Sequence, residues 1–260
     1  MNKLSILALF IFVLIFWLEG VFPYFKQRSA RLLHGANNAA VAVINALINL
    51  VFLLTAIPFI IRLAGMKSFG LGNFSTGKRY ALFLAIFLLF DFWMYLWHKA
   101  NHTFALLWRL HRAHHNDIMM DVTTALRFHP FEILISLTLN TGIVALLGMN
   151  LTHIAVYNAF LQMVTSFHHS NIALPERFDR VLRAVIVTPN MHRVHHSIEY
   201  KETNSNYSSV FSFWDRFFFT FRKRQDTHTI TYGLNMLRDK KWQELKGFFA
   251  IPFFTPLEEN

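Results

Sequence analysis

Long apolar runs constrain the fold of this chain more than any other feature of its sequence. A helix needs about 20 mostly apolar residues to cross the hydrocarbon core of a bilayer. Three runs are close to that length or longer, at residues 4–22, 37–61 and 80–97. The first begins like a signal peptide, but no small-residue cleavage site follows it, so we expect an uncleaved membrane helix. The low content of charged residues, 15% of 260, agrees with a membrane protein.

A further apolar region is broken at 148–150 by the sequence GMN. We predict a hairpin of two helices on either side of this break, at about 133–147 and 151–167. Each helix is shorter than a full membrane span, so the pair either crosses the bilayer twice or dips partway into it. In both arrangements the chain returns to the side that it left, which places residues 98–130 and 168–260 together.

Basic residues gather on that shared side, among them the run RKR at 222–224. The positive-inside rule makes this side cytoplasmic, although the loops at 24–35 and 62–79 are also basic. The formal charge of +10 suits loops that face anionic lipid headgroups, and we expect no nucleic-acid partner. The predicted fold is an all-α integral membrane protein with about three transmembrane helices, a helical hairpin and a cytoplasmic, histidine-rich helical cap.

Histidines occur in clusters with the spacing of metal ligands. The pattern H-x-x-H-H appears twice, as HRAHH at 111–115 and HRVHH at 192–196. On a helix its first and last histidines share a face, so each pattern can offer two or three nitrogens to a metal. The chain has no cysteine, so a metal must be bound by imidazole or oxygen. Ten of the 14 histidines fall in four clusters: His98/His102, His111/His114/His115, His168/His169 and His192/His195/His196.

These clusters contain more imidazoles than one ion can accept, so two ions fit the count. Imidazole binds Zn, Cu, Fe and Ni, which leaves the identity of the metal open. Asp91, Tyr95, His98 and His102 have helical spacings that place them on one stripe. Because ligating histidines usually donate their second N–H to a carboxylate or carbonyl, we expect Asp91 to accept such a bond.

The remaining histidines have simpler interpretations. We expect His34 and His228 on the surface and a hydrogen bond from His153 within the hairpin. His129 precedes Pro130, so it is expected in extended conformation just before a helix, with a role in supporting the metal ligands left open.

The order H-x-x-x-H, H-x-x-H-H, R-x-H-P-x-E, F-x-H-x-N and H-x-x-H-H resembles the fatty acid hydroxylase/sterol desaturase superfamily of membrane oxygenases. The matching segments run from about Asp91 to Phe221, half of the chain. The resemblance implies a centre of two metal ions, iron in the active enzyme, with zinc as an inactive substitute and O2 as co-substrate. It also implies a lipid substrate, such as a fatty acyl chain or a sterol, that is hydroxylated or desaturated.

Residue by residue, the resemblance assigns nine metal ligands. They are His98, His102, His111, His114, His115, His169, His192, His195 and His196. His168 is a further candidate, and Thr165 stands where some members have another histidine. Positions expected to support the ligands are Asp91, Tyr95, Arg127, His129, Asn171, Asn206 and Asp215. Ser208 and Phe219 replace glycines that are usual in the family, which bears on the local backbone geometry.

The same resemblance divides the chain into a transmembrane region at 1–80, a fatty acid hydroxylase-like catalytic domain at 81–225 and a C-terminal tail at 226–260. No fused cytochrome b5 or ferredoxin domain is visible, so we expect a separate electron-donor protein of one of these kinds, with its reductase. The alternative is a histidine-rich membrane protein that binds or transports metal without oxygenase activity. A transporter should carry polar residues at mid-membrane depth in several helices, and this chain offers chiefly Asp91, Asn45 and Asn49.

Overall fold

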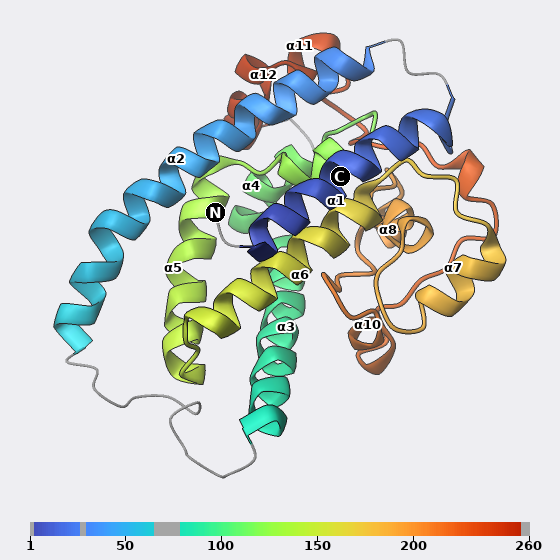
Figure 1. Cartoon of the computed structure of the whole chain (residues 1–260). Helices are drawn as coiled ribbons and strands as arrows, with labels where there is room; N and C mark the ends of the chain where they lie inside the picture. The colour runs from blue at the N-terminus through green and yellow to red at the C-terminus, as the bar shows by residue number, and fades with distance from the viewer. Residues whose placement is uncertain (1–2, 27–29, 65–78, 256–260) are drawn as a thin grey trace.

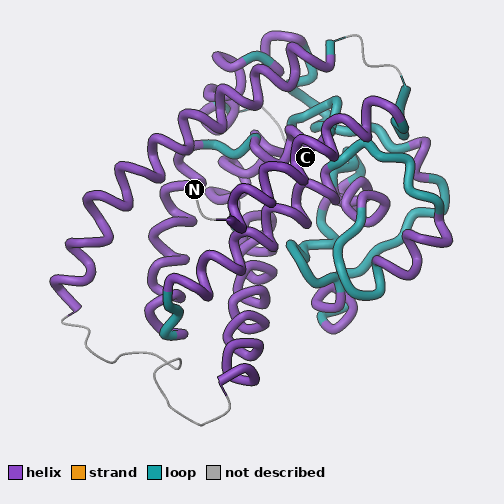
Figure 2. Tube along the Cα trace, viewed as in Figure 1, coloured by secondary structure: helices purple, strands orange, loops and turns teal. Residues whose placement is uncertain are grey.

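The computed structural model describes residues 3–26, 30–64 and 79–255 of the chain. Within these ranges the backbone forms helices and loops, with isolated β-bridges and no strands (Figure 2). The all-α prediction is therefore confirmed for the described part of the chain.

Five long helices form the apolar part of the molecule (Figure 1). They are α1 (Lys3–Val21), α2 (Arg31–Ala64), α3 (Arg79–Thr103), α5 (Pro130–Leu147) and α6 (Leu151–His169). Segments of α1, α2, α3 and α5 are long and apolar enough to cross a membrane. The predicted membrane helices and hairpin are confirmed, and α2 begins before the predicted start at residue 37.

The hairpin turn between α5 and α6 follows from two residues with turn chemistry. Gly148 ends α5 in the left-handed conformation, with φ of 65°, which costs glycine little because it has no Cβ. Asn150 begins α6 by accepting hydrogen bonds from the backbone N–H groups of Thr152 and His153. The His153 ring bonds back to Asn150, with 2.8 Å between Nδ1 and Oδ1, as expected for this histidine.

The other helices are short and form a cap at the end of the molecule where α3 and α6 terminate (Figure 1). They are α4 (Ala105–His115), η2 (Val122–Leu126), α7 (Glu176–Leu182), α8 (Pro189–His195), α9 (Tyr200–Thr203), α10 (Phe213–Phe217), η3 (Thr227–Thr229), α11 (Lys240–Gln243), α12 (Leu245–Ala250) and η4 (Ile251–Phe253). The segments before and after the hairpin therefore lie together, as the sequence predicts.

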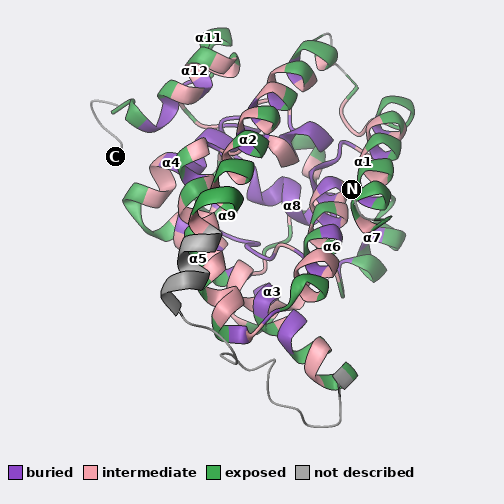
Figure 3. Cartoon of the chain, turned by 60° about the vertical axis from the view of Figure 1, so that its left-hand side comes forward, coloured by how far each residue is buried: buried purple, intermediate pink, exposed green. Residues whose placement is uncertain are grey.

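Burial divides the molecule into two parts (Figure 3). Large apolar side chains on the long helices are exposed, for example Phe10, Trp17 and Leu54, as expected for lipid-facing positions. Buried residues are concentrated in the cap and the adjoining ends of α3 and α6, and many of them are polar. Buried polar groups need hydrogen-bond partners, so an interior with many of them is typical of a functional site.

Glu19 anchors the first membrane helix to this cap. This acidic residue lies in the last turn of α1 and is only 1% exposed. Its Oε2 atom accepts hydrogen bonds from the backbone N–H groups of Val122 at 3.1 Å and Asn171 at 2.9 Å. The end of α1 is thus attached to the segments on either side of the hairpin.

His34 near the start of α2 makes a second attachment, and its predicted surface location is wrong. The ring is buried, with Nε2 at 2.8 Å from Asp117 Oδ2 and Nδ1 at 3.1 Å from Asp121 Oδ2. These carboxylates lie more than 80 residues away in the chain, so sequence spacing gives no sign of them. His228 is exposed as predicted, and its ring stacks on Tyr24.

Candidate metal centre

The nine histidines that the resemblance assigns as metal ligands meet in the cap in two groups. The five-histidine group consists of His98, His102, His111, His115 and His195. The four-histidine group consists of His114, His169, His192 and His196. Within each group one ring nitrogen per residue can be chosen so that all lie within 4.8 Å of one another. Histidine clusters that can bind metal are therefore present.

Each H-x-x-H-H motif contributes to both groups, and helix geometry explains why. On α4, His111 and His115 are four residues apart and share a face, while His114 points to the other group. On α8 and its C-cap, His192 and His196 share a face and His195 points away. The repeated motif thus connects two neighbouring groups instead of forming one group each.

Backbone carbonyls hold four of these rings in place. Nδ1 lies 2.8 Å from the Tyr207 carbonyl oxygen in His98, and 2.6 Å from that of Ser205 in His195. In the four-histidine group, Nδ1 of His114 and His169 lies 3.1 and 2.8 Å from the carbonyl oxygens of Arg127 and Thr165. A carbonyl only accepts, so each Nδ1 carries the proton and each Nε2 presents a lone pair.

Glu132 holds a fifth ring and was missed as a site residue in the sequence. Its Oε1 atom accepts a hydrogen bond from Nδ1 of His111 at 2.8 Å, and both side chains are buried. The residue stands in the first turn of α5. An acidic residue at the start of an apolar helix is the signal that could have identified it, by the same argument that was applied to Asp91.

The inward nitrogens fit bound metal ions. Nε2 of His169 lies 3.2 Å from that of His114 and 3.1 Å from that of His192, and the Nε2 atoms of His98 and His195 are 3.1 Å apart. Facing lone pairs at this distance repel unless a proton or a cation lies between them. Imidazole nitrogens bound to one ion at about 2.0–2.1 Å lie roughly 2.9–3.4 Å from each other.

Electrostatics keep these rings neutral. Burial lowers the pKa of the His195 imidazole to about 3. Burial, followed by the proximity of other histidines, also lowers the pKa values of His114, His115, His192 and His196. A neutral ring is the form that binds a metal, so the site is prepared for ligation at neutral pH.

His168 lies beside the four-histidine group without belonging to it. Its ring centroid is 4.0 Å from that of His192 and 4.6 Å from that of His169. Its Nδ1 atom is buried and has no hydrogen-bond partner in the described part of the chain. Thr165, at the position of an additional family histidine, supplies its backbone carbonyl to His169 instead of a side-chain ligand.

Asp91 has a different role from the one expected. The carboxylate is fully buried and accepts hydrogen bonds from Tyr157 Oη at 2.9 Å, Trp214 Nε1 at 2.9 Å and the Phe211 backbone N–H at 3.2 Å. It bonds to no histidine among the described residues. These bonds join α3 to α6 and to the segment around α10. The partners are distant from Asp91 in the chain, so sequence spacing gives no indication of them.

Tyr95, on the same stripe, is also buried, and its hydroxyl lies 3.0 Å from that of Thr220. His129 is the N-cap of α5 in extended conformation, as predicted. Its ring accepts from the Phe131 N–H and contacts the Phe249 carbonyl. It has no hydrogen bond to either histidine group among the described residues, so it shapes the start of α5.

Asp215 positions the loop that carries the Tyr207 carbonyl. Its two carboxylate oxygens accept the backbone N–H groups of Tyr207 at 2.7 Å and Ser208 at 2.9 Å. Asn206 donates to the carbonyl of Met191, next to His192, and to that of Arg222. Both residues act through the backbone on segments that hold the histidines.

Arg127 and Asn171 connect the site to the first two helices. Arg127 supplies its carbonyl to His114, and its guanidinium donates to Asn38 Oδ1 at 3.1 Å. Asn171 donates its backbone N–H to Glu19. Of the positions expected to support the ligands, Arg127, Asn206 and Asp215 act on the histidines or their loops through the backbone. The side chains of Asp91, Tyr95, His129 and Asn171 make no hydrogen bond to a histidine among the described residues.

Phe219 illustrates a departure from the family pattern. It has φ of 58°, in the left-handed region that favours glycine, and its side chain is 95% exposed. The usual glycine at this position is thus replaced by a residue that must adopt a glycine-like conformation.

A cavity of about 490 Å³ opens beside the histidines and extends between the long helices. At one end it is lined by rings of both groups and by Glu132, and farther along by Met94, Trp97 and Leu161. Ligand pockets commonly have volumes of about 300–1,000 Å³. The cavity thus connects the candidate metal centre with the space between the long helices.

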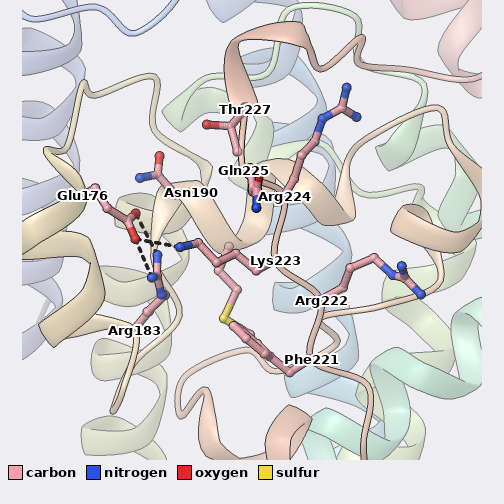
Figure 4. A pocket seen from close by; sticks show the side chains of 10 residues that line it. Glu176, Arg183, Asn190, Phe221, Arg222, Lys223, Arg224, Gln225 and Thr227 are labelled. Atoms are coloured by element: carbon pink, nitrogen blue, oxygen red, sulfur yellow. Dashed lines mark hydrogen bonds and ion pairs between the residues drawn. The ribbon is translucent and has the colours of Figure 1, made fainter.

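A second hollow, of about 40 Å³, lies on the cap surface (Figure 4). Lys223 and Arg183 converge on the carboxylate of Glu176 there, at 2.8 and 2.7 Å. The hydrogen bonds from Arg183 and Lys223 lower the pKa of Glu176 to about 2. No histidine lines this hollow, so it is an ion-pair cluster separate from the candidate metal centre.

Comparison with known proteins places these residues in a family context. The profile of the fatty acid hydroxylase family matches residues 83–220, just over half of the chain, which include all nine histidines. An ornithine lipid hydroxylase of Rhizobium tropici is 31% identical over 163 residues, covering 62% of this chain and 46% of the relative. An alkylglycerol monooxygenase of Caenorhabditis elegans is 31% identical over 158 residues, covering 57% of this chain and 29% of the relative.

A very-long-chain aldehyde decarbonylase of Oryza sativa subsp. indica is 29% identical over 150 residues, covering 52% of this chain and 23% of the relative. The chain spans less than half the length of these curated relatives. No solved structure matches the chain.

Proposed function

The chain belongs to the fatty acid hydroxylase family, and on that premise we propose that it is a membrane-embedded oxygenase that hydroxylates or desaturates a lipid. One observation carries the proposal. Nine histidines, distant in sequence, form two groups at the end of a cavity that extends between membrane helices. Similarity to a lipid hydroxylase, a lipid monooxygenase and an aldehyde decarbonylase supports the same class of chemistry.

We assign one iron ion to each histidine group, with His98, His102, His111, His115 and His195 holding one and His114, His169, His192 and His196 holding the other. Imidazole suits iron, and zinc would bind without redox activity. When bound, iron would supply the activation of O2, so that in hydroxylation one oxygen atom enters a C–H bond and the other leaves as water, with two electrons and two protons consumed. A separate donor protein, of the cytochrome b5 or ferredoxin kind with its reductase, would provide the electrons.

The protein's own groups prepare the site for this reaction. Glu132 and the carbonyls of Tyr207, Ser205, Arg127 and Thr165 each hold an Nδ1 proton outward, which directs Nε2 toward the metal position. Such fixed orientation limits the reorganisation that a ligand shell needs during the reaction.

The apolar part of the cavity wall excludes water and orients the lipid chain. Met94, Trp97, Phe128 and Leu161 line the cavity between the histidines and the deeper membrane region. A hydrocarbon chain can therefore reach the centre without leaving an apolar environment.

We also infer that the cap faces the cytoplasm. His34 attaches the start of α2 to the cap, so the connection between α1 and α2 lies on the same side of the membrane as the cap. Basic residues near this connection, such as Lys26 and Arg31, therefore add to the positive charge on the cap side. This increases the charge asymmetry on which the positive-inside rule depends.

The decisive experiment compares lipids made by the protein and by a variant. Membranes containing the protein, iron and an electron-donor system should convert a lipid to a product that carries one ¹⁸O atom from ¹⁸O2, or that lacks two hydrogens. His192→Ala should form no such product, while exposed His228→Ala should retain activity. Two bound metal ions with no lipid oxidised under any donor system would instead favour the metal-binding or transport alternative.

A further inference from the structure

Polar side chains line the part of the cavity that lies between the long helices, away from the histidines. Asn140 on α5 and Asn158 on α6 are nine residues before and after position 149 at the hairpin turn, so they lie at similar depth. At 1.5 Å per residue, Asn140 is about 12 Å along α5 from Glu132, and Asn158 about 16 Å along α6 from His169. Beyond them, a buried cluster that includes Phe87 closes the space between α3 and the hairpin.

Helix packing uses only one hydrogen bond of these two amides. Asn45 provides the contrast, because its amide donates to the Phe128 carbonyl at 2.8 Å and it does not line the cavity. Asn140 accepts from Trp93 Nε1 at 2.7 Å, which fixes its side chain while its own N–H groups have no acceptor among the described residues. The Asn158 side chain lines the cavity and is exposed between the helices, and it has no hydrogen-bond partner in the described part of the chain. Polar groups at membrane depth are costly, which favours a role in binding.

The charge of the lining restricts the ligand. Among the residues that the structure describes, no lysine or arginine lines the cavity, and the one acidic residue in its lining, Glu132, already bonds to His111. A lipid carboxylate or phosphate placed there would lie between membrane helices without a counter-ion from this lining, at a large free-energy cost. Amide side chains instead offer a donor and an acceptor together, which match an amide or a hydroxyl group.

We propose that the lipid substrate carries an uncharged hydrogen-bonding group, an amide or a hydroxyl, that binds between Asn140 and Asn158 while the carbon to be oxidised lies at the histidines. The substrate class deepens the proposed function and rests on it. The two asparagines act as specificity residues, because they set the distance between the polar group of the substrate and the oxidised carbon. The cavity volume accommodates one chain of a lipid with this group.

Binding to metal-free protein tests the proposal without requiring activity. Lipid nanodiscs containing the full chain would be titrated with four probes of equal chain length: a primary amide, an alcohol, a free acid and an alkane. Native mass spectrometry measures the bound fraction. The amide and the alcohol should bind about tenfold more tightly than the alkane, the gain expected from a net hydrogen bond or two. Equal binding of amide, alcohol and alkane, or tightest binding of the free acid, would overturn the proposal.

The double variant Asn140→Leu/Asn158→Leu locates the effect. It should remove the preference for the amide and alcohol and leave alkane binding unchanged. Thr138→Val is the matched control, since Thr138 lies on α5, is exposed and bonds only to its own helix. A preference that survives in a folded double variant would contradict the assignment, and the probe series on the unmodified chain decides the proposal if the variant does not fold.

Turnover of the same probes separates this inference from the proposed function. If iron-loaded protein binds the amide selectively but oxidises no probe, the proposed binding site stands and the proposed oxygenase activity is wrong. If the alkane and the amide are oxidised with equal efficiency, the proposed oxygenase activity stands and the proposed binding site is wrong.

Discussion

The five-histidine and four-histidine groups share two sequence motifs, yet the protein supports them differently. In the five-histidine group, a carboxylate holds His111 and carbonyls hold His98 and His195. Nδ1 of His102 in this group has no partner in the described part of the chain. In the four-histidine group only carbonyls hold His114 and His169, and the Nδ1 atoms of the other two rings have no partner in the described part of the chain.

The two groups also differ in their access to the cavity. His114, His169 and His192 of the four-histidine group line it, together with neighbouring His168, whereas the five-histidine group contributes two rings. A hydrogen-bonded carboxylate makes an imidazole a stronger ligand. We infer that the five-histidine group is the tighter metal site and that the four-histidine group lies closer to the cavity in which the proposed lipid would bind.

Loss of one ligand from either group should have the largest effect. His195→Ala and His192→Ala should each reduce lipid oxidation at least about 100-fold. Even the loss of a residue that only hydrogen-bonds to a metal ligand lowers metal affinity or activity about 10- to 100-fold. Metal analysis should show about one ion lost from the affected group. Exposed His228→Ala is the control, and full metal content with normal activity in either variant would contradict the assignment.

Glu132→Gln should distinguish the two groups. Loss of the carboxylate that orients His111 should weaken metal binding to the five-histidine group by about 10- to 100-fold. A chelator titration with two steps should show one step shifted and the other unchanged. Glu202→Gln, which changes an acid paired with Arg224 on the cap, serves as the control. A shift of both steps would show that the groups do not bind independently.

Acid should destabilise the metal-free protein. Burial lowers the pKa of His195 to about 3 in the folded state, while an exposed histidine titrates near 6.5. The unfolded chain therefore binds more protons below about pH 6.5, and stability should fall progressively from there toward pH 3. Thermal unfolding of chelator-treated protein should show the highest Tm above about pH 6.5. A Tm that is constant between pH 7 and 4.5 would show that the clustered histidine rings, such as His195, are not buried in neutral form.

Phe219→Gly should have the smallest effect and leave both groups intact. The left-handed conformation costs a non-glycine residue about 1–2 kcal/mol, partly offset by the greater entropy that glycine loses on folding. Because the ring is 95% exposed, little burial is lost, and the free energy of unfolding should rise by up to about 1 kcal/mol. Chemical denaturation would compare the free energy of unfolding of Phe219→Gly with that of Phe217→Gly. Phe217 is an exposed neighbour in α10. Destabilisation by Phe219→Gly would contradict the expected strain.

The sequence predicts the long helices and the clustering of the histidines because both follow local rules. Apolar runs determine the membrane helices, and residues three and four apart on α4 and α8 determine which rings share a face. Gly148 and Asn150 mark the hairpin turn for the same reason.

The failures concern groups whose partners are distant in the chain. His34 is buried because it meets Asp117 and Asp121, and Asp91 bonds to Tyr157 and Trp214 instead of a histidine. Most ligand support comes from backbone carbonyls, which every residue possesses and which no motif marks. Glu132 was identifiable in principle, since it is an acidic residue in the first turn of an apolar helix.

The most direct test of the central claim is to locate metal in the folded protein. An anomalous difference map at the iron absorption edge, from crystals of iron-loaded protein prepared without oxygen, should show two peaks. One should lie among the ring nitrogens of the five-histidine group and the other among those of the four-histidine group. A single peak, or peaks away from these rings in protein that oxidises lipid normally, would contradict the account.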